Sequence, residues 1–141
     1  MKSVVSATSC ILMRNASALK KISPLTEILL IPREKPPLEG VLAIPGGRIN
    51  YHEKWEDACA REVKEETGYL ISPNKISLLR VSNAIYPDKH FLIVTGWGWL
   101  EGKDEEGTPE LESQWRTFEE VENMSTDSIV PNVKQTVAMM R

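Results

Sequence analysis

The chain has 141 residues, of which 41% are hydrophobic and 26% charged, and its formal net charge is −3 at pH 7. This length and composition fit one globular domain over residues 1–141 with its own core. The negative net charge argues against duplex nucleic acid or an anionic membrane as a partner. Two cysteines make no disulfide framework, and no stretch approaches the ~20 apolar residues that span a bilayer. We therefore expect a cytoplasmic protein.

Three short strands are expected before the first helix. Residues 3–13 alternate Val, Ile and Leu with Ser and Thr, and residues 26–31 form an apolar run that stops at Pro32. A polar hairpin loop is expected to join these two strands. A Pro- and Gly-containing loop over residues 36–40 follows, and residues 41–44 form a brief third strand.

The next segment predicts one helix. Residues 54–67 contain neither Gly nor Pro and are rich in good helix formers. Gly68 follows at the position of a left-handed C-terminal cap. At about 100° per residue, the apolar face of this helix consists of Trp55, Ala58, Cys59 and Val63. Its cysteine is therefore expected to be a small core residue.

A second hairpin is expected after the helix. Residues 75–85 and 90–100 have strand patterns, and a turn over residues 86–89 separates them. Trp97 and Trp99 lie two residues apart, so both project from one face of the second strand. Aromatic residues there could pack in the core or stack on a nucleobase.

The C-terminal part begins with an acidic segment. Residues 101–112 are interrupted by Gly and Pro and predict a solvated loop. A last strand is expected over residues 115–118. Thr117 and Glu120 have capping-box spacing at the start of a helix, and residues 131–141 predict a final amphipathic helix.

Carboxylates crowd the buried side of the first helix. Glu62 and Glu66 continue its apolar stripe, and Glu65 flanks that stripe. Like charges at a half-buried seam are costly unless a positive group lies among them. A divalent cation is the simplest remedy, and Mg²⁺ takes carboxylates together with waters and phosphates. The pattern predicts a Mg²⁺ site, which Mn²⁺ could also fill.

Four further residues are placed to support such a site. Arg61 precedes Glu65 by one helical turn, so the two side chains can pair and fix that carboxylate. Glu53 lies just before the helix, where its charge suits the positive end of the helix dipole. Gly46 and Gly47 allow a tight bend that brings the loop close to the helix.

These residues together resemble the signature of the Nudix hydrolases. Its fixed positions are filled here by Gly47, Glu53, Arg61, Glu62, Val63, Glu65, Glu66 and Gly68. Two residues depart from the common pattern: Tyr69 follows the signature where an aliphatic residue is usual, and Leu42 replaces a large aromatic residue. The Gly-Gly-Arg entry, Trp55 and the Trp-bearing last strand are most similar to MutT-type nucleoside triphosphate pyrophosphatases.

The resemblance implies a fold and a reaction. The fold is an α/β/α sandwich around a mixed β-sheet, with a loop-helix-loop signature and a C-terminal helix. The reaction is metal-dependent hydrolysis of a nucleoside diphosphate linked to X, here a (d)NTP giving a (d)NMP and pyrophosphate. The metal ligands would come from Glu62, Glu65, Glu66, Gly46 and a downstream glutamate. Glu53, Glu65 or that downstream glutamate would accept the proton from water, and Arg61 would orient a ligand.

The resemblance also suggests contacts outside the helix. In relatives a glutamate from the acidic segment reaches the metal site, and Glu112 is the first candidate here and Glu110 the second. Arg33 is a candidate phosphate contact, or simply a solvated residue. Tyr86 and the two glycines of the signature loop would contact substrate, and His52 lies in the same loop. Base and sugar preference would depend on the side chains of two loops, residues 33–38 and residues 86–90.

Two other functions remain open. One is hydrolysis of ADP-ribose, a nucleotide sugar or a dinucleoside polyphosphate. The other is a nucleotide-binding module without turnover, which is disfavoured because all the signature carboxylates are present. In every case the partner is a small nucleotide, and a homodimer is compatible with the sequence.

Overall fold

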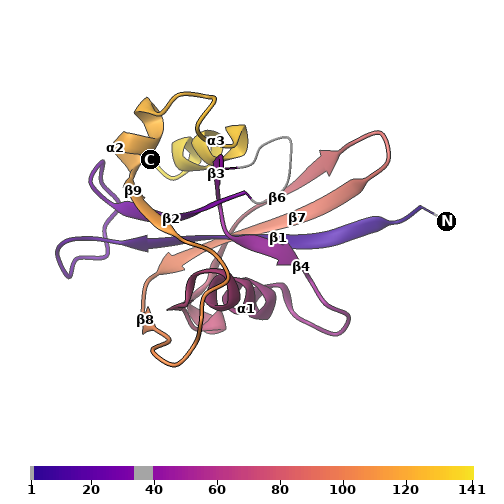
Figure 1. Ribbon diagram of the computed structural model, residues 1–141, viewed down its shortest axis with the longest axis horizontal. Coiled ribbons are helices and arrows are strands. Elements are labelled where there is room, and N and C mark those ends of the chain that lie inside the picture. Colours follow the sequence, from indigo (N-terminus) through magenta and orange to yellow (C-terminus); the bar gives the residue numbers. More distant parts are fainter. Residues whose placement is uncertain (1, 34–39) are drawn as a thin grey trace.

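The computed structural model describes residues 2–33 and 40–141 (Figure 1). The helices are α1 (Trp55–Thr67), α2 (Phe118–Asn123) and α3 (Pro131–Met139), with a 3₁₀ turn at Pro73–Lys75. The strands are β1 (Val4–Arg14), β2 (Glu27–Pro32), β3 (Leu42–Ala43), β4 (Gly46–Arg48), β5 (Tyr69–Leu70), β6 (Ser77–Ile85), β7 (His90–Trp99), β8 (Gly102–Lys103) and β9 (Gln114–Thr117). The loop predicted around Pro36 and Pro37 lies outside the described residues.

The central strand of the main sheet is β1. The sheet runs in the order β3-β2-β1-β7-β6, with β4 added on β1 and β9 on β2. The β1–β7 pairing is parallel and joins Val4–His90 through Met13–Trp99, whereas β1 is antiparallel to β2 and β4. This mixed sheet lies between α1 on one face and α2 with α3 on the other, which confirms the predicted α/β/α sandwich (Figure 1).

Each face of the sheet has its own core. Cys10 and Leu12 of β1 pack with Cys59 and Val63 of α1. The alternate residues of β1 pack with α2 and α3 on the other face, in a cluster that includes Ile11, Met13, Phe118, Val121, Val133 and Val137. Strand β1 is therefore buried on both sides, which explains the uninterrupted apolar run in its second half.

The structure confirms the predicted capping box and contains one strand pairing that the sequence did not predict. Trp97 and Trp99 pack partly buried against the α2/α3 cluster, which favours the core interpretation. The capping box is confirmed, since the Thr117 hydroxyl accepts from the Glu120 N–H and the Glu120 carboxylate accepts from the Thr117 N–H. The short β5–β8 pairing was not predicted. None of the described helices has the length and apolarity needed to cross a membrane.

The glycine pair at the start of the signature, Gly46 and Gly47, does not form the tight bend that we expected. Gly46 and Gly47 lie in the extended strand β4, opposite Ser9 and Thr8 of β1, and neither has a positive φ. A Cβ on Gly46 would lie 2.2 Å from the Thr8 carbonyl oxygen. This glycine is thus required for close approach between two backbones and not for a special dihedral angle.

We expect Gly46→Ala to lower the free energy of unfolding by about 2 kcal/mol or more, because overpacking against a backbone cannot be relieved by a rotamer change. Gly102→Ala is the matched control, since nothing lies within 4 Å of its added Cβ. That variant should stay within about 0.5 kcal/mol of wild type. Urea unfolding of the three proteins measures the difference, and equal stability of the two variants would contradict this account.

Candidate active site

Helix α1 presents acidic side chains along the border of its buried face. Ala58, Cys59 and Val63 are fully buried, as the periodicity predicted. The Glu62 side chain is 16% exposed and lies at that border, whereas the Glu65 side chain is 46% exposed and flanks it. The helix position relative to the core therefore sets which carboxylate is shielded and which reaches solvent.

The acidic segment after β8 binds the end of this helix. Gly68 has φ 78° and its N–H donates to the Lys64 carbonyl, which confirms the predicted left-handed cap. The N–H groups of Glu110 and Leu111 donate to the carbonyls of Glu65 and Glu66, each at 3.0 Å. Carbonyls that helix geometry leaves without partners are thus satisfied by a segment about 45 residues farther along the chain.

The two candidate downstream glutamates lie in different surroundings. The charge of Glu110 acts on the pKa of both Glu62 and Glu66. Glu112 is exposed, and no contact within the described chain joins it to these carboxylates. The sequence put Glu112 first and Glu110 second. In the structure it is Glu110 whose backbone is bonded to the helix end.

Arg61 is the positive group among these carboxylates. Its Nε and Nη2 donate to the two carboxylate oxygens of Glu53 at 2.8 and 2.9 Å, and Nη2 also donates to the Arg48 carbonyl. Nη1 donates to Glu62 at 2.8 Å, and its separation from Glu65 is longer, 3.4 Å. The predicted Arg61–Glu65 pair is therefore the weakest of these contacts, since the bidentate geometry with Glu53 is preferred.

Glu53 is held by the loop as well as by the arginine. The Asn50 N–H donates to its carboxylate at 3.0 Å, and the side chain is 16% exposed. Hydrogen bonds from Arg61 and then from the Asn50 backbone lower the pKa of Glu53. Its carboxylate thus faces Arg61 and the loop, and the first turn of α1 has its own acidic residues, Glu56 and Asp57.

The backbone of β4 lies directly against the acidic face of α1. The Gly46 N–H donates to the Glu66 carboxylate at 2.9 Å. A Cβ on Gly47 would lie 2.5 Å from the Glu62 carboxyl carbon. The absence of a side chain at Gly47 therefore leaves the space that the Glu62 carboxylate occupies.

Burial makes this cluster electrostatically unfavourable. Desolvation is the main cause that raises the pKa of Glu62, and it raises that of Glu66 to about 7. The neighbouring carboxylates add to both shifts, and Arg61 opposes only the shift of Glu62. Ionising the pair at neutral pH thus costs free energy in the absence of a further positive charge.

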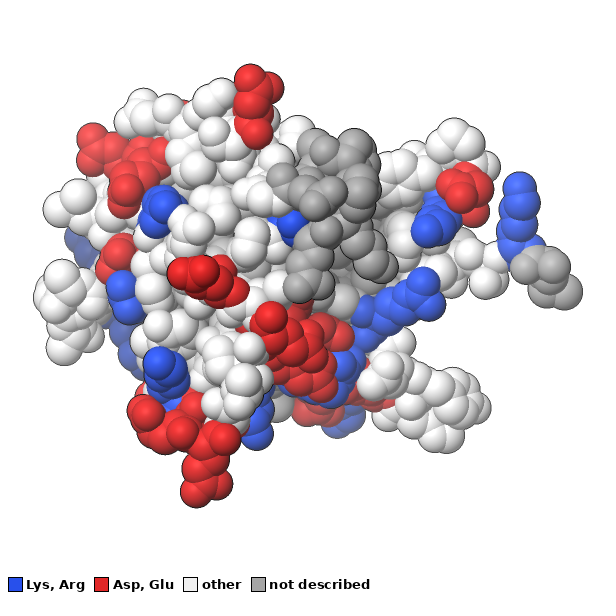
Figure 2. Space-filling model, viewed as in Figure 1, with Lys and Arg blue, Asp and Glu red and all other residues white. Residues whose placement is uncertain are grey.

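The donor chemistry fits a hard divalent cation. Glu62, Glu65, Glu66 and Glu110 offer only oxygen atoms, the ligands that Mg²⁺ prefers. Within the described part of the chain, no three acidic, His or Cys side chains converge on a metal position. Glu62 is instead turned onto Arg61, and Glu66 accepts from Gly46. Figure 2 shows acidic side chains gathered over α1 and β4, with basic side chains beside them.

Two predicted substrate contacts lie apart from this cluster. Arg33 is exposed at the end of β2, where its carbonyl accepts from the Gly40 N–H. Tyr86 is 57% exposed at the β6–β7 turn and lies edge-on to Phe91. No contact among the described residues joins Arg33 or Tyr86 to the α1 carboxylates.

The loop between β4 and α1 carries an exposed aromatic pair, of which the sequence singled out only His52. His52 has φ 66°, and its ring stacks on that of Tyr51 with centroids 4.0 Å apart. Tyr51 is 91% exposed. The other histidine, His90, is half-buried on β7, and its Nε2 contacts the Asn83 side-chain oxygen.

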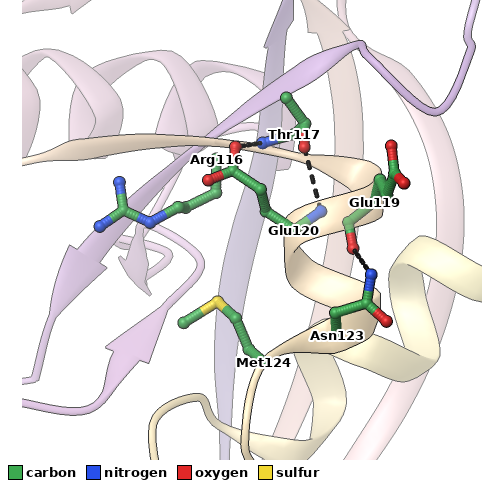
Figure 3. A pocket seen from close by; sticks show the side chains of 6 residues that line it. All are labelled: Arg116, Thr117, Glu119, Glu120, Asn123 and Met124. Carbon is green, nitrogen blue, oxygen red and sulfur yellow. Dashed lines mark hydrogen bonds between the residues drawn. The ribbon is translucent and has the colours of Figure 1, made fainter.

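A hollow elsewhere on the molecule does not belong to this site. It is lined by Arg116, Thr117, Glu119, Glu120, Asn123 and Met124 at the start of α2 (Figure 3). Thr117 and Glu120 form the capping box, and Asn123 donates to the Glu119 carbonyl. These polar groups therefore serve the helix, on the opposite face of the sheet from α1.

The amino-acid sequence of this chain is similar to a known family and to several known proteins. A family model described as NUDIX domain matches residues 7–137. The chain is 31% identical to an 8-oxo-dGTP diphosphatase of Escherichia coli over 106 residues, which cover 71% of this chain and 74% of that protein. It is 44% identical to an ADP-ribose pyrophosphatase of Methanocaldococcus jannaschii over 63 residues, 45% of this chain.

The extent of these matches differs. The chain spans only 35% of the M. jannaschii protein, and only 26% of a nudix hydrolase of Caenorhabditis elegans. Among solved structures, a MutT NUDIX hydrolase from Burkholderia pseudomallei superposes with a TM-score of 0.75 at 19% identity, covering 99% of this chain and all of the other. A NUDIX hydrolase from Nitrosomonas europaea gives 0.77 at 18% identity, with 97% and 88% coverage. At these identities the structures show a shared fold.

The raised pKa of Glu66 predicts a pH dependence of stability in the metal-free protein. The folded state binds this proton more tightly than the unfolded chain, whose carboxyl has its ordinary value of 4.5. The free energy of unfolding should therefore fall as pH rises from about 4.5 to 7, by on the order of 1 to 3 kcal/mol. Glu53, with its lowered pKa, acts in the opposite sense and below this range.

Denaturant titrations in EDTA at several pH values measure this fall. Glu66→Gln should remove the larger part of it, and Glu112→Gln should leave the wild-type profile unchanged. A wild-type protein whose stability rises across this interval would show that the carboxylates are not under strain.

Proposed function

The chain belongs to the Nudix family, and from this we propose that it is a divalent-metal-dependent pyrophosphohydrolase that cleaves a nucleoside triphosphate into the monophosphate and pyrophosphate. The observation that carries the proposal is the half-buried carboxylate pair Glu62 and Glu66, placed against the backbone of β4. A bound cation would stabilise the ionised form of like-charged groups held in this way. A phosphate-rich substrate would share that cation.

We assign the cation to Glu62, Glu65, Glu66 and Glu110, with the backbone of Gly46 beside them. Mg²⁺ or Mn²⁺ bound there would neutralise the pyrophosphate oxygens and make the attacking water more acidic. Gly46 and Gly47 would line the substrate site through their main chain, because the absence of side chains lets β4 lie against β1 and against the Glu62 carboxylate. Arg61 holds Glu53 and Glu62 in fixed orientations through its fork of donors.

Among the candidate general bases, the contacts favour Glu65. Both oxygens of Glu53 accept hydrogen bonds from Arg61, and its pKa is lowered, so it is a poor proton acceptor. Glu65 is 46% exposed and has only the 3.4 Å contact with Arg61. We therefore assign to Glu53 the positioning of Arg61, and to Glu65 the removal of a proton from water.

The triphosphate assignment is supported by the E. coli relative, an 8-oxo-dGTP diphosphatase whose match covers most of both chains. A second candidate is ADP-ribose, supported by the M. jannaschii relative. That match has higher identity, but it covers less than half of this chain. Both reactions hydrolyse a phosphoanhydride bond and would use the same carboxylates.

We expect Glu65→Gln and Glu66→Gln to lower kcat at least about 100-fold, because each removes a charge from the proposed metal site. Glu110→Gln should lower activity less, and Glu112→Gln should remain close to wild type. Initial rates with Mg²⁺ measure these effects, and circular dichroism checks that each variant is folded. Near-wild-type turnover in both Glu65→Gln and Glu66→Gln would overturn the assignment.

A substrate panel tests the reaction itself. Canonical and oxidised dNTPs, NTPs, ADP-ribose, nucleotide sugars and diadenosine polyphosphates would be incubated with Mg²⁺, and the products separated. We expect pyrophosphate and a monophosphate from triphosphates, and no turnover in EDTA. Ribose 5-phosphate from ADP-ribose as the main product would favour the second candidate. Tight nucleotide binding without turnover of any compound would indicate a binding module instead.

A further inference from the structure

Apolar side chains gather at the outer end of the sheet, away from the carboxylates. Four large ones are more than half exposed there, Val4, Val81, Ile85 and Tyr86, and Leu78 near the other end of β6 is also more than half exposed. They lie on the start of β1, on β6 and at the β6–β7 turn. Exposed apolar groups that cluster in this way mark a contact surface more often than isolated ones do.

The helices leave this part of the sheet uncovered. The register places Val4, His90 and Ile85 in one row across β1, β7 and β6, and Thr8, Val94 and Val81 in another. The Thr8 hydroxyl contacts Cys59 of α1, so these rows belong to the α1 face. Figure 1 shows that β6, β7 and the start of β1 extend beyond α1. Ile85 therefore lies in a row at the outer end of this face, whereas Val81 shares its row with Thr8 and is exposed on the edge strand.

Strand β6 is also the edge of the sheet, and its outward main-chain groups can be identified. Tyr86 and Lys89 exchange hydrogen bonds across the turn. Hydrogen-bonded and non-hydrogen-bonded pairs alternate along an antiparallel ladder. The N–H and C=O groups of Val81, Asn83 and Ile85 consequently point away from β7. Within residues 2–33 and 40–141, no strand pairs with this edge.

This edge lacks the usual protection against strand pairing. Natural edges are blocked by Pro, by Lys or by acidic side chains. Residues 81–85 contain none of these, and Arg80 is the one charged residue of β6. A bulge between Leu78 and Arg80 and the turn after Ile85 limit the regular stretch to residues 81–85. The centre of that stretch is Asn83.

We propose that β6 pairs antiparallel with β6 of a second copy of this chain, about a twofold axis at Asn83. The stretch is self-complementary, because its outward residues read apolar, polar, apolar in both directions. In this register Val81 faces Ile85 of the second copy, and Asn83 faces its own equivalent. Three hydrogen-bonded pairs give about six main-chain hydrogen bonds.

The same register avoids like-charge repulsion. Arg80 lies opposite Tyr86 of the second copy and not opposite another arginine, and its guanidinium donates to Thr136 and Met139 of α3 in its own chain. Val4 lies in the same row as Ile85, with His90 of β7 between them. The β6 edge of a second copy can therefore pair with this edge without bringing like charges together.

Sedimentation velocity from about 5 to 200 µM protein tests the proposal through mass action. The wild-type chain should sediment with the mass of two chains, and Val81→Lys with Ile85→Lys should give single chains. Leu19→Lys with Leu25→Lys is the matched control. Those leucines are 71% and 69% exposed, as accessible as Val81 and Ile85, but lie in the loop between β1 and β2. The control should remain dimeric.

A backbone test uses Asn83→Pro, which removes an N–H that makes no bond to β7 and should also give single chains. Hydrogen exchange on the wild type needs no variant, and the amides of Val81, Asn83 and Ile85 should be protected in a concentration-dependent way. Wild-type single chains at all concentrations, a dimer that survives the double lysine change, dissociation of the control, or rapid exchange of these amides in a dimer would each overturn the proposal.

Discussion

The site depends on an imbalance of charge, because one arginine lies among several carboxylates. Arg61 contacts Glu53, Glu62 and Glu65, while Glu66 lies deeper and is reached by a backbone N–H. One positive charge cannot balance these groups, and burial magnifies the imbalance because water screens it poorly. The local excess of negative charge is thus fixed in place by the fold, and it would favour a divalent cation beside these carboxylates.

The fold can hold this unfavourable cluster because other contacts fix the middle and the C-terminal end of its helix. Cys59 and Val63 anchor the middle of α1 in an apolar core shared with β1. The loop before β9 binds the last carbonyls, and β4 presses against the acidic side. The stability gained from apolar burial offsets the repulsion, so the carboxylates cannot separate by moving the helix. The same helix of thirteen residues therefore contributes to the apolar core and carries the carboxylates.

Local patterns predicted most of the elements and the identity of the acidic face. The extent of α1, its Gly68 cap and its buried residues follow from periodicity and composition, which need no partner. The strands β4, β5 and β8 have two or three residues each and exist because of distant partners, so no local period predicts them. The i,i+4 rule favoured Glu65 as the partner of Arg61, whereas the folded loop brings Glu53 into bidentate contact. The docking of Glu110 likewise depends on tertiary structure. The assignment to the Nudix family and its MutT-type members agrees with the comparisons.

The parallel pairing of β1 with β7 has a consequence for how the molecule folds. It joins Val4 to His90, which are 86 residues apart (90 − 4), at the centre of the sheet. Such a contact closes a long loop and forms slowly, whereas α1 and the β6–β7 hairpin need only neighbours in sequence. During synthesis the hairpin can exist before its inner strand has a place in the sheet, with both of its edges open. This order of events would leave a transient two-stranded hairpin whose unpaired edges can associate with other chains. Its lifetime would depend on how quickly β1 pairs with β7.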